Sequence, residues 1–233
     1  MRVILRIDGR NVPKGWSRNE IFFSDDNITS NAFTQATKII NAYLTQPFSE
    51  TMPVGFTVTV EATQMPKVLI IEDIETVKSA EAGEEIDVKV KLREWRKGIT
   101  ERTFKMKIPK DASGVTELIV RGGSVEPLSS PAIEEGLMSI NSLERMLTEL
   151  KAVDANNELI IELNNDTLNE ALKKAMKKKH NRNADHEPDL LPEEEEYLSE
   201  TKARRIKEGT LKIYSTEYFI DGMMKRLINV HND

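Results

Sequence analysis

The chain contains no cysteine, which excludes disulfide bonds, thiol catalysis and metal sites with cysteine ligands. No apolar run approaches the length that spans a bilayer, and the first ten residues lack the hydrophobic core of a signal peptide. The net charge of -6 gives no general attraction to nucleic acid or to an anionic membrane. We therefore expect no membrane span and no nucleic-acid partner.

The sequence also lacks the motifs of common enzyme classes. It has no GxSxG nucleophile elbow, no HExxH zinc motif and no phosphate-binding P-loop. Carboxylates are plentiful, but none lies in a recognisable acid–base pattern with His or Ser. Catalytic groups can converge in space from distant positions, so a carboxylate-based hydrolase is a third alternative. We expect no catalytic residue and no cofactor.

Alternation of apolar and polar residues is clearest between Val68 and Gly123. Runs with a period of two occur at Val88–Leu92, at Phe104–Ile108 and, more weakly, at Leu118–Val120, and turn-forming residues separate them. Several short antiparallel strands at this spacing predict a central immunoglobulin-like β-sandwich over residues 66–123.

A small β-β-α-β unit is predicted before the sandwich, over residues 1–65. Its elements are expected in this order: a strand at 2–8, a strand at 18–23, a helix at 30–44 and a strand at 55–62. The first two strands should pair as a hairpin. Ser30 or Thr29 is the expected N-cap of the helix.

After the sandwich, residues 124–233 predict a helix-strand unit, which gives an α+β, mostly β fold class overall. Its elements are a helix at 137–153, capped by Asn141, and strands at 158–163, 209–214, 218–220 and 225–230. The last strand needs a sheet to join, so this unit should pack on residues 1–65. A charged insertion at 166–208 turns from basic to acidic, and we expect a protruding helix or a mobile excursion.

The candidate binding residues are centred on two tryptophans. Trp95 lies at the end of a predicted strand beside Arg93 and Arg96. Exposed, it would anchor a partner; buried, it would close the end of the sandwich with an arginine stacked on its ring. Trp16, next to a predicted turn, is expected to be the more exposed. Binding would use these loop ends or a sheet edge.

Three further patterns have structural explanations that we favour. His186 lies among acidic residues, but its spacing matches no ligand pattern, so no metal is expected. The basic run at 173–182 lacks aromatic residues and precedes an acidic run, which favours self-pairing or solvation over phosphate binding. Gly122-Gly123 lacks the rest of a phosphate-binding fingerprint, so it should permit a sharp turn.

Several phrases of the sequence resemble the non-catalytic C-terminal region of the sporulation stage IV B (SpoIVB-type) serine peptidase family. The similarity covers most of the chain outside about 166–208. The phrases are RIDGR (6–10), DDNITSNAFTQATKIINAYL (25–44), GFTVTVEA (55–62), AGEEIDVKVKLREWRKG (82–98), TFKMKIPKD (103–111), ELIVRGGS (117–124), SLERMLTEL (142–150), NNELIIEL (156–163) and STEYFIDGM (215–223).

The resemblance implies an accessory region, since the Gly-Met-Ser-Gly-Ser-Pro-type motif of the family's catalytic serine is absent here. Its partner would be another protein or an upstream peptidase domain, and it would lie at the cell envelope or outside the cell. Without the resemblance, a cytoplasmic protein is expected. The main alternative is a structural assembly subunit of virion or surface-layer type, which would form a homo-oligomer.

Overall fold

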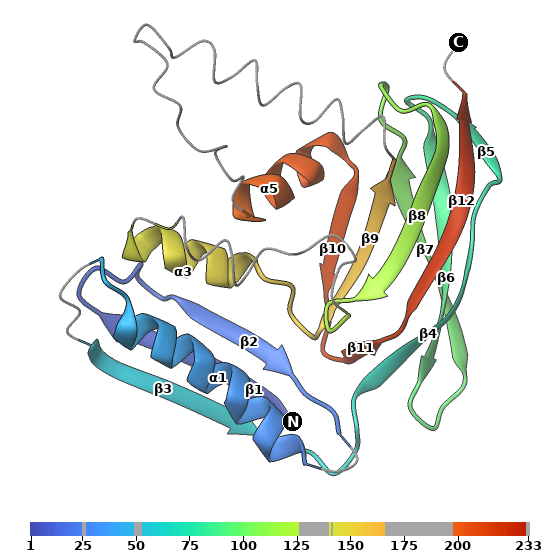
Figure 1. Cartoon of the computed structure of the whole chain (residues 1–233). Helices are drawn as coiled ribbons and strands as arrows, with labels where there is room; N and C mark the ends of the chain where they lie inside the picture. Colours follow the sequence, from blue (N-terminus) through green and yellow to red (C-terminus); the bar gives the residue numbers. More distant parts are fainter. Residues whose placement is uncertain (25–26, 49–52, 126–139, 141, 166–197, 232–233) are drawn as a thin grey trace, which may run out of the picture.

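The structure is a computed structural model that describes residues 1–24, 27–48, 53–125, 140, 142–165 and 198–231 (Figure 1). Within these residues the chain forms three sheets and three helices, and strands outweigh helices. The expected α+β, mostly β class is therefore confirmed. None of the helices in this part of the chain is long and apolar enough to cross a membrane.

The N-terminal sheet has the strand order β2-β1-β3, with both neighbours antiparallel to β1. Its elements are β1 (Arg2–Gly9), β2 (Ser17–Ile21), α1 (Ile28–Thr45) and β3 (Pro53–Glu61). The predicted hairpin and the β-β-α-β order are both present. The helix begins slightly earlier than expected, because the side chain of Asn27 accepts a hydrogen bond from the Ser30 backbone N–H at 3.1 Å and caps it.

Two larger sheets pack face to face and form what we call the two-sheet body (Figure 1). Their orders are β10-β9-β8-β12-β5 and β11-β4-β6-β7. The strands are β4 (Val68–Glu75), β5 (Ser79–Glu81), β6 (Glu85–Glu94), β7 (Ile99–Lys107), β8 (Gly114–Gly122), β9 (Glu158–Asn164), β10 (Leu211–Ser215), β11 (Phe219–Asp221) and β12 (Met223–His231).

The core of the body draws on strands from both halves of the sequence. Val88 of β6 and Leu118 of β8 share it with Ile161 of β9 and Ile228 of β12, and all four are fully buried. The sheets expected within residues 66–123 therefore also take strands from beyond residue 158. β12 lies between β8 and β5; it pairs with β8 along almost its whole length and with β5 over residues 229–231.

The helix α3 (Leu143–Ala152) leaves the body and packs on the N-terminal sheet. Its Leu147 lies in one cluster with Leu5 and Ile7 of β1 and Tyr43 of α1, so α1 and α3 cover the same face of that sheet. The cap is Ser142, whose side chain accepts from the Arg145 N–H, rather than the expected Asn141. Of the unit expected at 124–233, the helix thus packs on residues 1–65 and the strands join the body.

Candidate functional site

The outer edge of β3 is an exposed strand edge of unusual composition. β3 pairs with β1 on one side, and no strand of the described residues pairs with it on the other (Figure 1). Its nine residues read PVGFTVTVE, so the only charged side chain is Glu61 at the end. An unpaired row of N–H and C=O groups on a long, uncharged strand is a template for pairing with another chain.

The inner face of β3 is apolar but only partly covered. Because side chains alternate along a strand, three apolar residues of β3 share the face that looks toward the helices. They are Phe56, Val58 and Val60, which pair with the buried residues of β1, whereas Val54 lies at a register shift. Val58 lies opposite Leu5, which is buried, yet Val58 itself is 36% exposed and Val60 is 40% exposed. The apolar face that is buried on β1 therefore continues onto β3, where it is only partly covered.

A flank of α1 extends this apolar surface. The helix buries Ala32, Ala36 and Tyr43, and Tyr43 packs edge-on against Phe56 of β3 with ring centroids 5.7 Å apart. The helix connects β2 to β3, which run parallel to each other, through a right-handed crossover (Figure 1). In a right-handed crossover, the α1 residue one position after each buried residue points toward β3.

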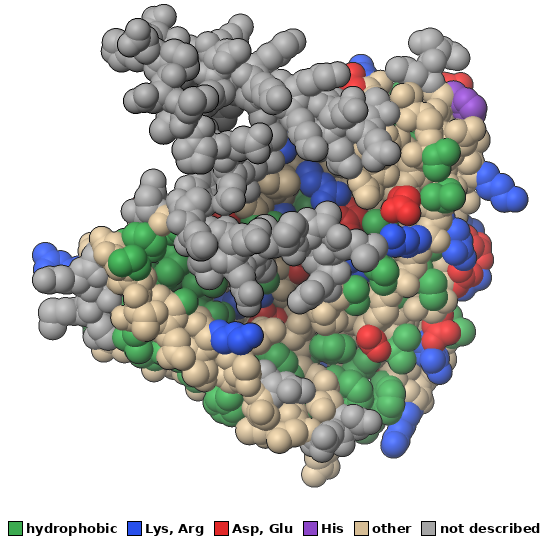
Figure 2. Space-filling view, viewed as in Figure 1, with side chains coloured by type: hydrophobic (Ala, Val, Ile, Leu, Met, Phe, Trp, Pro, Cys, Tyr) green, Lys and Arg blue, Asp and Glu red, His purple; other side chains and the backbone are tan. Residues whose placement is uncertain are grey.

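Two of these following residues are large and exposed. Phe33 is 40% exposed and Leu44 is 49% exposed. We call this region the β3 surface: the outer main-chain edge of β3, the inner-face side chains Val58 and Val60, and the α1 side chains Phe33 and Leu44. Figure 2 shows hydrophobic side chains at the surface over α1 and β3. The arrangement can pair with a main chain and bury apolar side chains at the same time.

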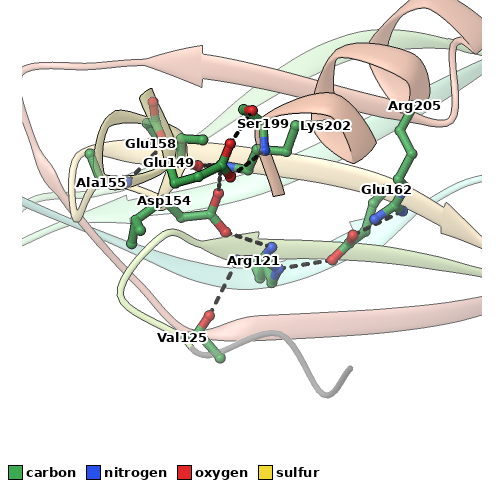
Figure 3. Close-up of polar contacts among 12 residues, drawn as sticks. Arg121, Val125, Glu149, Asp154, Ala155, Glu158, Glu162, Ser199, Lys202 and Arg205 are labelled. Carbon is green, nitrogen blue, oxygen red and sulfur yellow. Dashed lines mark hydrogen bonds and ion pairs between the residues drawn. The ribbon is translucent and has the colours of Figure 1, made fainter. Parts of the chain in front are cut away.

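A buried cluster of charges forms the other notable site (Figure 3). Arg121 of β8 is 3% exposed, and its guanidinium donates to Asp154 and to Glu162, each at 2.8 Å. The other sides of these two carboxylates face α5 (Leu198–Glu208), where Lys202 pairs with Asp154 and Arg205 pairs with Glu162 at 3.0 Å. Burial alone would lower the pKa of Arg121, but the two carboxylates raise it above its ordinary value.

A second buried arginine closes the end of α3. Arg18 of β2 donates to the carbonyl oxygens of Leu150, Val153 and Asp154 at 2.7, 3.1 and 3.1 Å. It also donates to Glu20 at 2.7 Å. A cation at these unpaired carbonyls is favourable at a helix C-terminus. The charged groups thus fasten β2, α3, β8, β9 and α5 together, and every cation that we trace here has a protein partner.

A further carboxylate, that of Glu158, lies near Lys202 and Asp154 of this cluster. Burial raises the pKa of Glu158, whose carboxylate accepts a hydrogen bond from the Ala155 backbone N–H at 2.9 Å. That contact closes the turn before β9. Among the described residues, no group of three or more His, Asp or Glu side chains could hold a metal ion. His180 and His186 and the basic run at 173–182 lie outside the described residues.

Trp95 occupies the join between the N-terminal sheet and the body. It is half-buried; its ring packs on Phe23, which follows β2, with centroids 5.2 Å apart, and the Arg96 guanidinium lies 6.0 Å from its ring centroid. Arg93 pairs with Glu72 at 2.6 Å. Trp95 is thus neither fully exposed nor fully buried, and its ring packs on Phe23 across the join.

Trp16 is not the exposed residue that the sequence indicated. It is 3% exposed, and its indole N–H donates to the Leu147 carbonyl at 3.0 Å. The expectation was wrong because α3, more than a hundred residues later in the chain, covers the turn beside Trp16. The structure does not bring the two tryptophans together in one site: one lies in the core under α3 and the other at the join.

The glycine pair after β8 is explained by close backbone packing. A Cβ atom on Gly122 would overlap the Ile220 carbonyl, and one on Gly123 would overlap the Ala155 carbonyl. Neither position can accept a larger residue without moving main chain. Gly122-Gly123 therefore has a structural role where β8, β11 and the turn before β9 meet.

Comparisons of the chain with protein-family models, with curated proteins and with solved structures found no match.

Proposed function

We propose that this chain is a non-catalytic protein-binding region that accepts an extended strand of a partner protein at the β3 surface. The proposal rests on two features that occur together at β3. Its outer main-chain edge has no neighbouring strand among the described residues, and its apolar inner face is only partly covered. In strand addition, main-chain hydrogen bonds supply affinity and pockets for alternate side chains supply specificity.

The composition of β3 defines the partner segment. The inner-face residues of the partner strand would cover Val58 and Val60, so they must be apolar, whereas the residues between them face solvent beside Thr57 and Thr59. A charged residue on the inner face would be buried without an opposite charge, which is costly. The preferred partner is thus a strand with alternating apolar and polar residues.

The resemblance to SpoIVB-type proteins suggests a wider proposal about the role of the chain. We propose that the chain is the accessory region of such a protein and positions its serine peptidase region, or contacts another protein, at the cell envelope. In that scheme the two-sheet body is an immunoglobulin-like sandwich. Sequencing of the gene upstream of Met1 tests it, because a Gly-Met-Ser-Gly-Ser-Pro-type motif must precede the region.

Strand addition itself is tested with a peptide that copies β1, residues 2–9, because β3 already pairs with that sequence in the fold. The peptide is titrated into isotopically labelled protein and followed by amide NMR shifts. We expect shifts confined to β3 and the exposed flank of α1. The matched control peptide carries Leu5→Pro, which removes a main-chain donor and should bind less. Shifts centred on β7, or none with either peptide, would refute the proposal.

A structural assembly subunit is the second candidate. It is favoured by the presence of open edges on different sheets, β3 on one and β7 on another. Pairing between unlike edges does not close on itself and produces open arrays. A mass that grows without limit as concentration rises, measured by light scattering, would support this candidate over the first.

A further inference from the structure

We infer that the strand accepted at β3 is β3 of a second copy of this chain, in an antiparallel pair with its two-fold axis at Thr57. The inference rests on the proposed function and adds the identity of the partner. It follows from the sequence of β3, from the flank of α1 and from the absence of like charges that would face each other.

The sequence of β3 is self-complementary about Thr57. In an antiparallel pair with the axis at this residue, the paired residue numbers add up to 114. Over the regular part of the strand, Gly55 then faces Thr59, Phe56 faces Val58, and the two copies of Thr57 face each other. Aromatic with β-branched pairs and threonine pairs are among the favourable cross-strand combinations.

The same register keeps the chemical character of both faces. On the inner face Phe56 meets Val58, so apolar residues meet apolar residues, and the outer face joins Gly55 to Thr59 across the axis. Glu61, the only charged residue of the strand, lies at its end, outside this paired stretch. Like charges therefore do not oppose each other anywhere along the pair, which is the usual obstacle to edge pairing.

The helix α1 would supply the second part of the interface. A two-fold axis perpendicular to the sheet places both copies of α1 on one face, antiparallel to each other. The helix contacts both β1 and β3, so its axis lies between these two strands. Adjacent strands lie about 4.8 Å apart, so the two helix axes would lie about two strand spacings apart, which is within the roughly 8–10 Å at which helices pack. The exposed Phe33 and Leu44, on the β3 side of α1, would then lie between the helices.

The position of α1 along β3 agrees with this axis. At one end Tyr43 contacts Phe56, and at the other Ala32 clusters with Val3, which pairs with Val60. The middle of the helix therefore lies above the middle of the strand, close to Thr57. Strand pairing alone is marginal in water, so contact between the helices is needed for a stable dimer. The product is a dimer with one continuous six-stranded sheet and the two copies of α1 across its centre.

The test uses charge at the axis, because residue 57 is the only one of β3 that faces itself. Thr57→Lys and Thr57→Glu each place two like charges opposite each other, and each should weaken dimerisation at least about tenfold. An equimolar mixture of the two variants places Lys against Glu and should restore the dimer. Mass is measured by size exclusion with light scattering over a wide concentration range; the unmodified chain should approach twice 26.5 kDa.

Two controls separate this register from general disturbance of the edge. Thr59→Lys brings its charge opposite Gly55 and should weaken the dimer less than Thr57→Lys. Thermal unfolding under monomeric conditions shows whether each variant is folded, and Phe33→Glu tests the helix contact without touching the strand.

The outcomes also distinguish the two proposals. A chain that stays monomeric at all concentrations but binds the β1 peptide at β3 overturns this inference and leaves strand addition intact. A dimer that persists in both Thr57 variants uses another surface and overturns it as well. Failure of both the peptide and the dimer overturns the inference together with the proposed function.

Discussion

Two strand edges of this molecule, β3 in the N-terminal sheet and β7 in the two-sheet body, differ in the way they meet solvent. Both are nine-residue outer strands of their sheets among the described residues. β7 carries four charged residues of both signs, and Lys105 pairs with Glu85 of β6 at 2.8 Å. β3 carries no charge before Glu61. Charged side chains are a common protection of edge strands against pairing, and only one of these edges has it.

The inner faces of the two strands differ in the same sense. On β7, Met106 is fully buried and Phe104 packs on Tyr214 of the facing sheet with ring centroids 4.7 Å apart. On β3, Val58 and Val60 remain exposed. The open edge therefore coincides with the open face, which indicates that pairing competence is local to β3 and does not follow from the overall composition of the chain.

The largest effect should come from Trp16→Ala, which breaks the support of β3 and spares β7. Removal of a buried tryptophan costs about 3–5 kcal/mol of unfolding free energy. Trp16 lies under α3 in the N-terminal cluster, away from the core of the body. Hydrogen exchange should show loss of protection in β1–β3 and little change in β6 and β7. Trp16→Phe, which keeps the ring but loses the indole N–H, is the milder control. Equal loss in both sheets would mean that they unfold as one unit.

Next in size is the effect of a charge placed on the open face. Val58→Lys sets an ammonium group on the inner face and should weaken binding of the β1 peptide at least about tenfold, or about 1.4 kcal/mol. Thr103→Lys puts the same charge on β7, which already carries Arg102 and Lys105, and should leave binding unchanged. NMR titration measures both. Equal weakening by the two variants would contradict the contrast between the edges.

The reverse change should make β7 resemble β3, with a smaller effect. Replacement of Glu101, Arg102 and Lys105 by threonine removes charge from the edge, and exposed ion pairs contribute about 0–1 kcal/mol each to stability. We expect a folded variant whose mass by light scattering rises with concentration. The same replacement of charged residues on α5 would serve poorly as a control, since they pair with buried groups. An unchanged mass would show that burial of the β7 inner face, rather than charge, protects this edge.

The smallest effect concerns Glu158, at the start of β9. Burial raises the folded-state pKa of Glu158, so the folded protein binds its proton more tightly than the unfolded chain does. Stability from this group is therefore present below the unfolded pKa and decreases as pH rises through the folded pKa. Glu158→Gln should stabilise the protein at neutral pH, and this gain should shrink in acid. Thermal melts across that pH range check the sign; a gain that grows in acid would contradict it.

Local patterns in the sequence predicted most elements of the fold. Period-two alternation located β6, β7 and β8, and helical spacing located α1. Neither property reveals which strands pair, because pairing depends on contacts between distant segments. The position of β12 between β8 and β5 joins residues from opposite ends of the body and has no local signal.

The candidate site was only partly predictable for the same reason. GFTVTVEA was identifiable as a strand, and its lack of charge was a usable sign of an unprotected edge, but its place at the edge of the sheet was not. In the sequence, Arg121 stands at a polar position of an alternating run, where a side chain normally faces solvent. It is buried because α5 and the turn before β9 cover it. Trp16 was misplaced by the same mechanism, a cover that comes from far along the chain.

The hydrogen bond between Trp16 and Leu147 has a consequence for the order of events during synthesis. The two residues are 131 positions apart, so the ribosome must complete α3 before the N-terminal core can close. Until then, the hairpin and α1 exist without their second helix, and their apolar face is open to other nascent or finished chains. Within the N-terminal unit, the last step in maturation should accordingly be the return of α3 to a sheet made long before it, since contacts of high sequence separation form late.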